Sequence, residues 1–152
     1  MIDFIKASAG DVELLMLSRL EMLRAVNELP SDYIFSDELI EKSREYFKSK
    51  NQTTVLAWDQ GVIGCATMCY IEVMPTFSHP TGKRAHLMNV FTKKEYRRQG
   101  IAGKMMNMLI DEAKEKGVTE ISLDATDMGR ALYKKFGFRE SEECMVLNIG
   151  NR

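Results

Sequence analysis

Residues 85–123 constrain the fold most, because a strand-like run leads through a short basic turn into a long amphipathic helix and then into a second strand-like run. The helix is expected over residues 98–116, and its inner face repeats with helical spacing at Ala102, Met105, Met106, Leu109 and Ala113. Strands joined through a helix pair in parallel, so residues 85–92 and 118–123 predict a parallel part of a sheet.

The first half of the chain predicts an antiparallel part of the same sheet. Residues 53–58 and 62–73 have strand-like patterns, and Asp59-Gln60-Gly61 between them suits a three-residue hairpin. Further strands are expected at residues 2–6 and 144–149, and further helices at residues 12–27, 36–50 and from Thr126 or Asp127 to about Gly137. The prediction is an α/β (α+β) fold with a mixed central sheet of about six to seven strands flanked by about four helices.

The composition fits one globular domain over residues 1–152. With 21 basic and 22 acidic residues the formal net charge is −1, which argues against a broad basic surface for nucleic acid. No apolar run is long enough for a transmembrane helix, and the first residues lack a signal-peptide pattern. Cys65, Cys69 and Cys144 are therefore expected as free, buried thiols in a reducing cytoplasm. The two histidines lack the spacing of metal ligands, so no metal is expected.

The start of the helix predicted at residues 98–116 combines two glycines with basic side chains. Glycine within a helix lowers helix stability by about 1 kcal/mol relative to alanine, so the presence of Gly100 and Gly103 in the predicted helix needs an explanation. One reason is a ligand close to the backbone N–H groups of the first turn, which lack partners within the helix and attract anions. Arg97, Arg98 and Lys104 add positive charge, so the segment predicts a phosphate or pyrophosphate site. The alternative is a solvated basic turn whose glycines serve packing.

Two separated motifs resemble the GNAT superfamily of N-acetyltransferases. Residues 97–102 (RRQGIA) resemble its R/Q-x-x-G-x-G/A motif, with Ala102 at the last position. Residues 132–138 (LYKKFGF) resemble its L-Y-x-x-x-G-F segment, and residues 88–92 resemble the strand that splays from its neighbour in that family. Neither the G-x-x-x-x-G-K-[ST] loop of nucleotide hydrolases nor the G-x-G-x-x-G loop of dinucleotide-binding folds is present.

The resemblance implies that acetyl-coenzyme A (acetyl-CoA) is the acetyl donor. It implies that backbone groups near Asn89, Val90 and Thr92 pair with the pantetheine arm, as an added strand would. The pyrophosphate is then expected at a continuous segment formed by Arg97, Arg98, Gln99, Gly100, Ile101, Ala102, Gly103 and Lys104. Many members carry asparagine seven residues before the motif tyrosine, where this chain has Thr126, and Thr126 is therefore the expected neighbour of the pantetheine.

Acyl transfer to an amine requires particular groups around the thioester. The resemblance places Tyr133 near the sulfur, where its hydroxyl can donate a hydrogen bond to the leaving thiolate. The oxyanion requires an N–H donor, and the backbone of Val90 or of a neighbouring residue is the expected one. Glu72 and His86, on strands expected to border the cleft, are candidate bases that act directly or through a water. Each of these two can instead be an ordinary strand residue.

Three interpretations of the function stay open at this point. The first is an N-acetyltransferase that uses acetyl-CoA to acetylate a primary amine of a small molecule or peptide, by direct attack in a ternary complex. The second is an inactive member of the same fold that binds acyl-CoA as a sensor or interaction module. The third is an unrelated phosphate-binding domain. No nucleic acid or membrane partner is expected, and the resemblance implies a homodimer as a common assembly.

Overall fold

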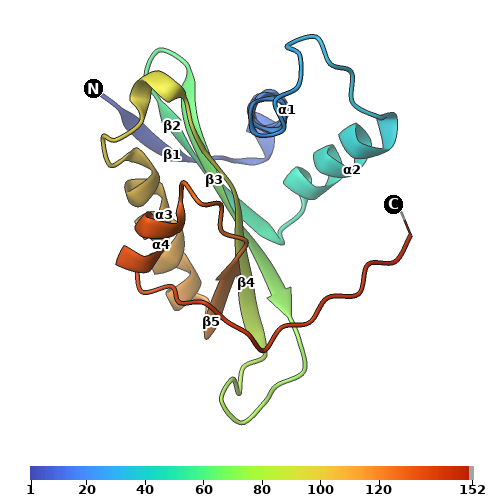
Figure 1. Ribbon diagram of the computed structural model, residues 1–152, viewed down its shortest axis with the longest axis vertical. Helices are drawn as coiled ribbons and strands as arrows, with labels where there is room; N and C mark the ends of the chain where they lie inside the picture. The colour runs from blue at the N-terminus through green and yellow to red at the C-terminus, as the bar shows by residue number, and fades with distance from the viewer. Residues whose placement is uncertain (151–152) are drawn as a thin grey trace.

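A five-stranded mixed sheet organises the computed structural model, which describes residues 1–150 (Figure 1). The strands follow one another across the sheet in chain order, and their bounds are β1 Asp3–Lys6, β2 Gln52–Trp58, β3 Val62–Glu72, β4 Lys83–Thr92 and β5 Glu120–Leu123. Hairpins or loops connect β2, β3 and β4, and these neighbours pair antiparallel. Among residues 1–150 only β4 and β5 pair in parallel, because a helix connects them.

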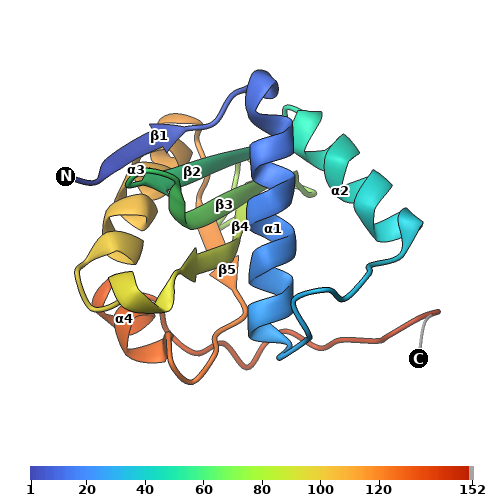
Figure 2. The ribbon, with the colours of Figure 1, turned by 90° about the horizontal axis from the view of Figure 1, so that it is seen from above.

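Helices cover both faces of the sheet (Figure 2). The helices α1 (Val12–Val26) and α2 (Asp37–Lys48) lie over one face, whereas α3 (Ile101–Glu115) and α4 (Arg130–Lys135) lie over the other. The Ser36 side chain caps α2 by accepting a hydrogen bond from the Leu39 backbone N–H, and Ser8 and Asp11 form a capping box before α1. Two short 3-10 turns, Ala9–Asp11 and Lys94–Tyr96, precede α1 and α3.

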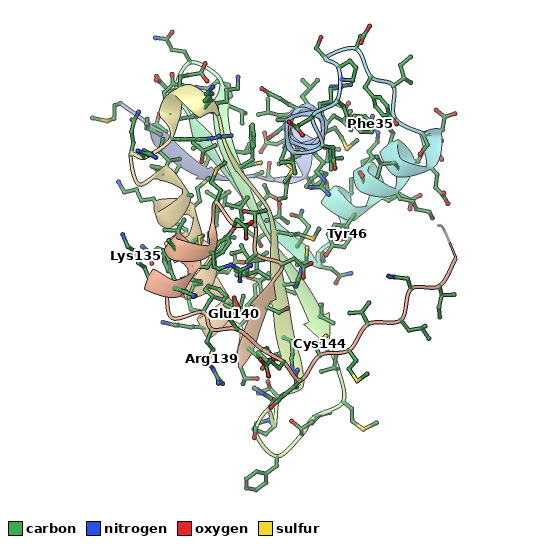
Figure 3. All side chains as sticks on the ribbon, viewed as in Figure 1. Phe35, Tyr46, Lys135, Arg139, Glu140 and Cys144 are labelled. Carbon is green, nitrogen blue, oxygen red and sulfur yellow. The ribbon has the colours of Figure 1, made fainter. Side chains whose placement is uncertain are left out.

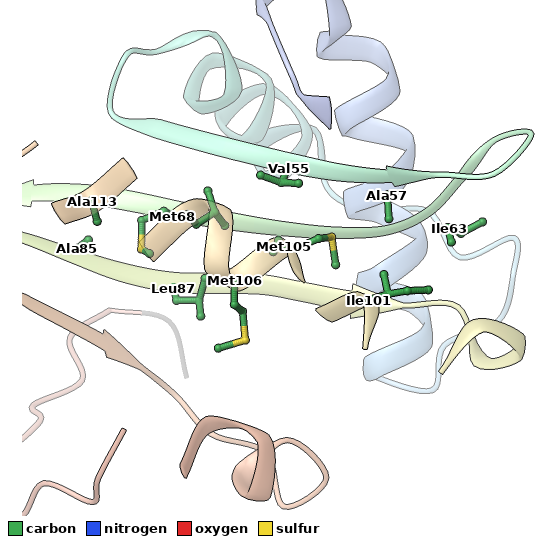
Figure 4. Packing of buried hydrophobic residues seen from close by; sticks show 12 residues of the cluster. Val55, Ala57, Ile63, Met68, Ala85, Leu87, Ile101, Met105, Met106 and Ala113 are labelled. Carbon is green, nitrogen blue, oxygen red and sulfur yellow. The ribbon is translucent and has the colours of Figure 1, made fainter. Parts of the chain in front are cut away.

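The main core lies between α3 and the sheet (Figure 4). Met105, Met106 and Leu109 on α3 are fully buried against strand side chains that alternate along β2, β3 and β4. The opposite face of the same strands presents Leu56 and Cys65 to Leu15 and Met16 of α1. Both faces of the central strands are therefore buried, which fixes their register and the position of every residue on β4.

Most of the predicted elements are confirmed, including the mixed sheet with its parallel part around α3. The helix expected from residue 98 begins at Ile101, because Arg98 and Gly100 both have left-handed backbone angles. The helix expected from Thr126 or Asp127 is preceded by a turn and begins at Arg130. The closing strand at residues 144–149 was a wrong prediction: within the described chain these residues pair with no strand, and the sheet has five strands instead of six or seven.

No helix within residues 1–150 is long and apolar enough to span a bilayer. The cysteines in the described chain are free, and Cys65 and Cys69 are buried as expected. The expectation was wrong for Cys144, which is exposed because it lies beyond the last helix in a segment that pairs with no strand among the described residues.

Glu112 of α3 anchors the helix to the sheet through polar contacts. It accepts hydrogen bonds from the hydroxyl of Tyr70 on β3 and from the ammonium of Lys6 on β1. Burial alone would raise the pKa of Glu112, but the hydrogen bonds from Tyr70, Thr53 and Lys6 outweigh it and hold the pKa below its usual value. A carboxylate with a lowered pKa stabilises the fold above its unfolded-state pKa and loses that contribution as the pH falls.

We expect Glu112→Gln to reduce the free energy of unfolding by about 1–3 kcal/mol at pH 7, because it removes a charged acceptor of two hydrogen bonds. The difference from the parent chain should shrink as the pH falls below about 4.5, where Glu112 becomes protonated in the unfolded chain. Denaturant unfolding at several pH values measures this, with Glu115→Gln on the exposed side of α3 as the control. A difference that does not vary with pH would contradict the assignment.

Candidate active site

The strands β4 and β5 pair over only four residues of each. The pairing runs from Arg84 opposite Glu120 to Leu87 opposite Leu123, after which the chain leaves β5 for α4 (Figure 1). β4 continues to Thr92, so residues 88–92 have no strand beside them on that edge within the described chain. Unpaired backbone N–H and C=O groups at a strand edge can bind an extended ligand as an added strand.

A β-bulge interrupts β4 at the start of this unpaired stretch. Cys65 lies opposite Phe91 and Thr67 lies opposite Met88, so two residues of β4, Asn89 and Val90, face the single residue between them on β3. Asn89 has a φ of 59°, in the left-handed region, and its side chain is only 6 % exposed. Bulges redirect the backbone locally, so the N–H and C=O groups of this stretch depart from the regular ladder.

A buried polar network holds the bulge in place. The guanidinium of Arg19 on α1 donates to the Asn89 Oδ1 over 3.1 Å, and the Asn89 Nδ2 donates to the Thr67 Oγ1 over 3.1 Å. The Thr67 hydroxyl in turn bonds to the Thr54 hydroxyl at 2.7 Å, and the Cys65 thiol donates to the backbone oxygen of Asn89. These hydrogen bonds engage the side chain and the backbone of Asn89 in its left-handed conformation, so the network stabilises the shape of the bulge.

Arg19 was missed from the sequence, although the pattern contained a signal for it. It follows Val12 by seven residues, Leu15 by four and Met16 by three, so it occupies the apolar stripe of α1. A charged residue in such a stripe requires a buried polar partner, which here is Asn89. Burial raises the pKa of the neighbouring Cys65 to about 11, so this cysteine stays a thiol and is no nucleophile at neutral pH.

The segment between β4 and α3 exposes the N-terminal backbone of α3. Gly100 precedes the helix with a φ of 76°, no side chain caps the helix, and its first turn carries no acidic residue. A Cβ on Gly100 would meet nothing within 4 Å, so open space lies beside it. Gly103 instead faces the ring of Phe136 at ordinary contact distance, which agrees with a packing role. The free N–H groups and the absence of acidic groups favour an anion at this helix terminus.

The basic side chains of this segment have different surroundings. Arg97 donates from its Nε to the backbone oxygen of Thr92 over 3.0 Å and so ties the segment to the end of β4. Lys104 extends over the ring of Phe4, with its Nζ 5.3 Å from the ring centroid. Arg98 and Gln99 are exposed. Ile101 is buried in the core, and Ala102 is half-buried in the first turn, so these two can offer a ligand only their backbone.

Tyr133 lies on α4, which follows the divergence of β5 from β4. Its ring packs closely over Gly129, where a Cβ would lie 2.8 Å from Tyr133 Cε2, and it contacts Phe138 edge-to-face with 6.1 Å between centroids. Burial raises the pKa of the Tyr133 hydroxyl above its usual value, so it stays protonated at neutral pH. Within residues 1–150 no protein group bonds to this hydroxyl. Thr126 accepts from the Gly129 N–H and so shapes the turn before α4.

The two candidate bases lie on neighbouring strands, with Glu72 of β3 opposite Lys83 and His86 three residues farther along β4. His86 lies where β4 and β5 are still paired, with its Nδ1 2.8 Å from the Ser122 Oγ and its Nε2 3.6 Å from the Asp124 carboxylate. Glu72 is exposed at the far end of β3, opposite Lys83. Six residues of strand separate Lys83 from Asn89, about 20 Å. His86 and the bulge therefore lie on either side of the point where β4 and β5 part, whereas Tyr133 packs against the main core on the α3 side of the sheet and Glu72 lies at the far end of β3.

The part of the chain that the structure describes contains no group of three His, Cys, Asp or Glu side chains able to hold a metal ion. The chemistry available here consists of backbone donors, a tyrosine hydroxyl and an imidazole next to a carboxylate.

Comparison of the sequence and the structure with known proteins identifies relatives of this chain. A sequence model of the acetyltransferase (GNAT) family matches residues 20–138. A solved structure from Clostridium acetobutylicum, described as a predicted acetyltransferase with acetyl-CoA, is 29 % identical, has a TM-score of 0.85, and the match covers 97 % of this chain and 96 % of that one.

Two curated enzymes match shorter segments. Thialysine N-epsilon-acetyltransferase of Sus scrofa is 33 % identical over 71 residues, which are 45 % of this chain and 42 % of that protein. Glucosamine 6-phosphate N-acetyltransferase of Trypanosoma brucei brucei is 25 % identical over 88 residues, 58 % of each chain. The match thus spans less than two thirds of either curated enzyme.

Asn89 offers a direct test of the network at the bulge. We expect Asn89→Ala to lower the free energy of unfolding by about 2–4 kcal/mol, because it leaves the Arg19 and Thr67 groups without a partner and strains a left-handed position. Asn89→Gly loses the same hydrogen bonds without the strain, so it should be less destabilising by about 1 kcal/mol. Denaturant unfolding measures both values. Equal stability of the two variants would show that the left-handed conformation is not retained.

Proposed function

The chain belongs to the acetyltransferase (GNAT) family, and we propose that it transfers the acetyl group of acetyl-CoA to a primary amine of a small molecule or peptide. One observation carries the proposal: an uncapped, acid-free helix N-terminus behind a left-handed glycine lies directly after a strand edge that has no neighbour. This arrangement offers an extended, phosphate-bearing thioester two kinds of backbone contact at once. The chain is thus an acyltransferase whose donor is acetyl-CoA.

The residues where β4 and β5 part suit the pantetheine arm and the pyrophosphate of acetyl-CoA. We assign the pantetheine arm to the free edge of β4 at Asn89, Val90 and Thr92, where unpaired backbone groups can continue the sheet. The pyrophosphate belongs at the backbone N–H groups from Arg98 to Gly103, supported by the charges of Arg98 and Lys104. Arg97 acts on this site indirectly, through its hydrogen bond to Thr92. Thr126 likewise acts through the turn before α4.

The reaction proposed is a direct displacement at the thioester carbonyl. The neutral amine attacks the carbonyl carbon, a C–N bond forms, and the carbonyl oxygen becomes an oxyanion that needs an N–H donor. We assign that donor to the backbone of Val90, because the bulge turns this stretch away from the regular ladder. The C–S bond then breaks, the thiolate leaves, and the attacking nitrogen gives up a proton. Holding both substrates in one cleft supplies the entropic advantage.

Tyr133 is the proposed partner of the leaving thiolate. Its reference pKa of about 10 is already above that of a thiol at about 8.5, and burial raises it further. Full proton transfer from the phenol to the thiolate is therefore unfavourable, and a hydrogen bond is the more effective contribution. The rigid packing of its ring on Gly129 and Phe138 would hold the hydroxyl in one position.

His86 is the better placed of the two candidate bases. Its imidazole is next to the Asp124 carboxylate, which would stabilise the protonated ring after it takes up the proton of the amine. It lies three residues before Asn89 on the same strand, about 10 Å away, so the proton would reach it through a chain of hydrogen-bonded waters. The roughly 20 Å of strand between Glu72 and the bulge argues against Glu72.

We also propose a class of acceptor, a cellular compartment and an assembly for this chain. The names of the two curated relatives describe transfer to amines of an amino acid analogue and an amino sugar phosphate, which supports a primary amine here. We further propose that residues 1–152 act as one catalytic domain, in a cytoplasm whose reducing conditions keep the buried Cys65 and Cys69 as free thiols. We also propose a homodimer as the assembly.

Release of free coenzyme A thiol from acetyl-CoA, measured with a panel of primary amines, tests the activity. The panel should include lysine analogues, amino sugars and short peptides, with the corresponding alcohols as controls. Amine-dependent thiol release is the expected result. Tight binding of acetyl-CoA with no release for any amine would instead indicate a binding module of the same fold.

Gln99→Glu tests the pyrophosphate site with no change in side-chain size. The variant places a negative charge just before the N-terminus of α3, and repulsion of a phosphate at a solvated surface costs on the order of 1 kcal/mol. Calorimetry should show about 5- to 10-fold weaker binding of coenzyme A. Asn107→Asp, an exposed change farther along α3, should leave the affinity unchanged. Equal affinity of Gln99→Glu and the parent would place the anion elsewhere.

Tyr133→Phe tests the hydrogen bond to the thiolate. Since the ring packing on Gly129 and Phe138 is kept, we expect unchanged stability and coenzyme A affinity with kcat lower by about 10- to 100-fold. Gly129→Ala should reduce kcat as well, because its Cβ would displace the tyrosine ring. An unchanged kcat in Tyr133→Phe would show that the hydroxyl does not assist the thiolate and that Tyr133 serves only in packing.

A further inference from the structure

Arg19 of α1 is a half-buried cation that has no acidic partner within residues 1–150. Its Nη1 donates to the Asn89 Oδ1 over 3.1 Å and to the Met22 sulfur over 3.5 Å, and both of these partners are neutral. Glu21, the acid nearest to it along α1, points to another side of the helix and pairs with Lys93. Burial lowers the pKa of the Arg19 guanidinium, which still stays charged at neutral pH. Because burial of a charge without an opposite charge is unfavourable, an anion from outside the chain would stabilise this site.

One edge of the Arg19 guanidinium is available to such an anion. Nη1 makes the only hydrogen bonds of this side chain within the described residues, so Nε and Nη2 have no partner there. Neither atom is sealed from solvent, since among residues 1–150 the Nε of Arg84 is the one fully buried side-chain nitrogen or oxygen that lacks a hydrogen bond. Nε and Nη2 form the edge of a guanidinium on which a carboxylate or a phosphate accepts two parallel hydrogen bonds.

The face of the sheet that α1 covers is open beside Arg19 (Figure 2). Side chains alternate along β4, and Leu87 points into the core beneath α3, so His86 and Met88 point to the face that α1 covers. Met88 is 40 % exposed although it directly precedes the bulge. Tyr46, near the end of α2, lies over the same face (Figure 3). A small molecule can therefore reach the bulge from this face, between the helices and β4.

Arg19 is also close to the position proposed for the acetyl group. Val90, the proposed oxyanion donor, directly follows Asn89, so one side chain and one hydrogen bond separate the guanidinium from that stretch of backbone. His86, the proposed base, points to the same face as Arg19. An amine that attacks a carbonyl held at Val90 is therefore within the reach of a small molecule from the free edge of the guanidinium.

We propose that the acceptor carries an oxyanion, a carboxylate or a phosphate, in addition to its primary amine, and that Arg19 binds this oxyanion. The inference rests on the acetyl transfer proposed above, because it concerns the second substrate of that reaction. The guanidinium holds the oxyanion by two charge-assisted hydrogen bonds and so orients the amine toward the thioester. Asn89 accepts from the remaining Nη1 and thereby fixes the plane of the guanidinium. Amines without an anionic group lack this contact and leave the charge of Arg19 without a counterion.

Matched acceptors test the preference in the parent chain through kcat/KM for thiol release. The carboxylate set compares ω-amino carboxylates from glycine to 6-aminohexanoate with their uncharged amides. The phosphate set compares O-phosphoethanolamine and glucosamine 6-phosphate with ethanolamine and glucosamine. In one of the two sets the anionic acceptors should have a kcat/KM about 10- to 100-fold higher, mainly through a lower KM, which also identifies the anion. Equal values within every pair would overturn the proposal.

Substitution of Arg19 tests whether this residue causes the preference. Arg19→Met should bring the ratio of the two kcat/KM values close to 1, and Arg19→Lys, which keeps the charge but loses the planar edge, should give an intermediate ratio. Since each ratio is taken within one variant, a general loss of activity from a disturbed bulge cancels, and Arg19→Lys decides if Arg19→Met does not fold. Arg44→Met is the matched control, because Arg44 is paired with Glu13, and should keep the parent ratio. A parent ratio in both Arg19 variants would overturn the assignment.

Binding without turnover separates this inference from the proposed activity. Calorimetry measures the same acceptor pairs on the chain saturated with coenzyme A, where the parent should bind the anionic member about 10- to 100-fold more tightly and Arg19→Met should bind both members equally. Such binding without thiol release from any amine would overturn the acetyl transfer but support the anion site at Arg19. Thiol release from uncharged amines without such binding would overturn the anion site but support the acetyl transfer.

Discussion

The parting of β4 from β5 after Leu87 is the constraint on which the candidate site depends. Up to that point the backbone of β4 is satisfied by neighbours on both sides, and beyond it one side is open. A buried strand cannot leave its backbone groups unpaired without cost, so the open edge requires water or a ligand of extended shape. The buried network from Arg19 through Asn89 to Thr67 fixes the bulge at this place, and α3 begins only a few residues after the strand ends.

Contacts on both faces of the sheet hold the residues around this open edge in place. The fully buried methionines and leucine of α3 hold the sheet from one side, and Arg19 of α1 holds the bulge from the other. Tyr133 is placed by contact with a glycine that leaves no room for a side chain and by the ring that follows α4. The groups that would act on a thioester are therefore positioned by packing and by the backbone, and the cysteines near them are kept as unreactive thiols by burial.

The sequence predicted those features that depend on local spacing. The stripe of α3, the hairpin between β2 and β3 and the helix expected from residue 36 all follow from short-range patterns, and the structure confirms them. The position of Glu72 far from the bulge could not be predicted, because it depends on the register of β3 and β4. The strand expected at residues 144–149 had the right pattern, but a strand also needs a partner, and none lies beside it in the described chain. Arg19 went unnoticed because its partner is 70 residues away.

Amide hydrogen exchange in the presence and absence of acetyl-CoA tests the central claim most directly, because the claim concerns backbone N–H groups. The account predicts that the ligand slows exchange at residues 88–92 of β4 and at residues 98–103 around the start of α3, with little change along β2. Protection confined to another surface, such as the groove near Lys50, Lys83 and Lys116 at the far end of the sheet, would contradict the account. Unchanged exchange at saturating acetyl-CoA would contradict it equally.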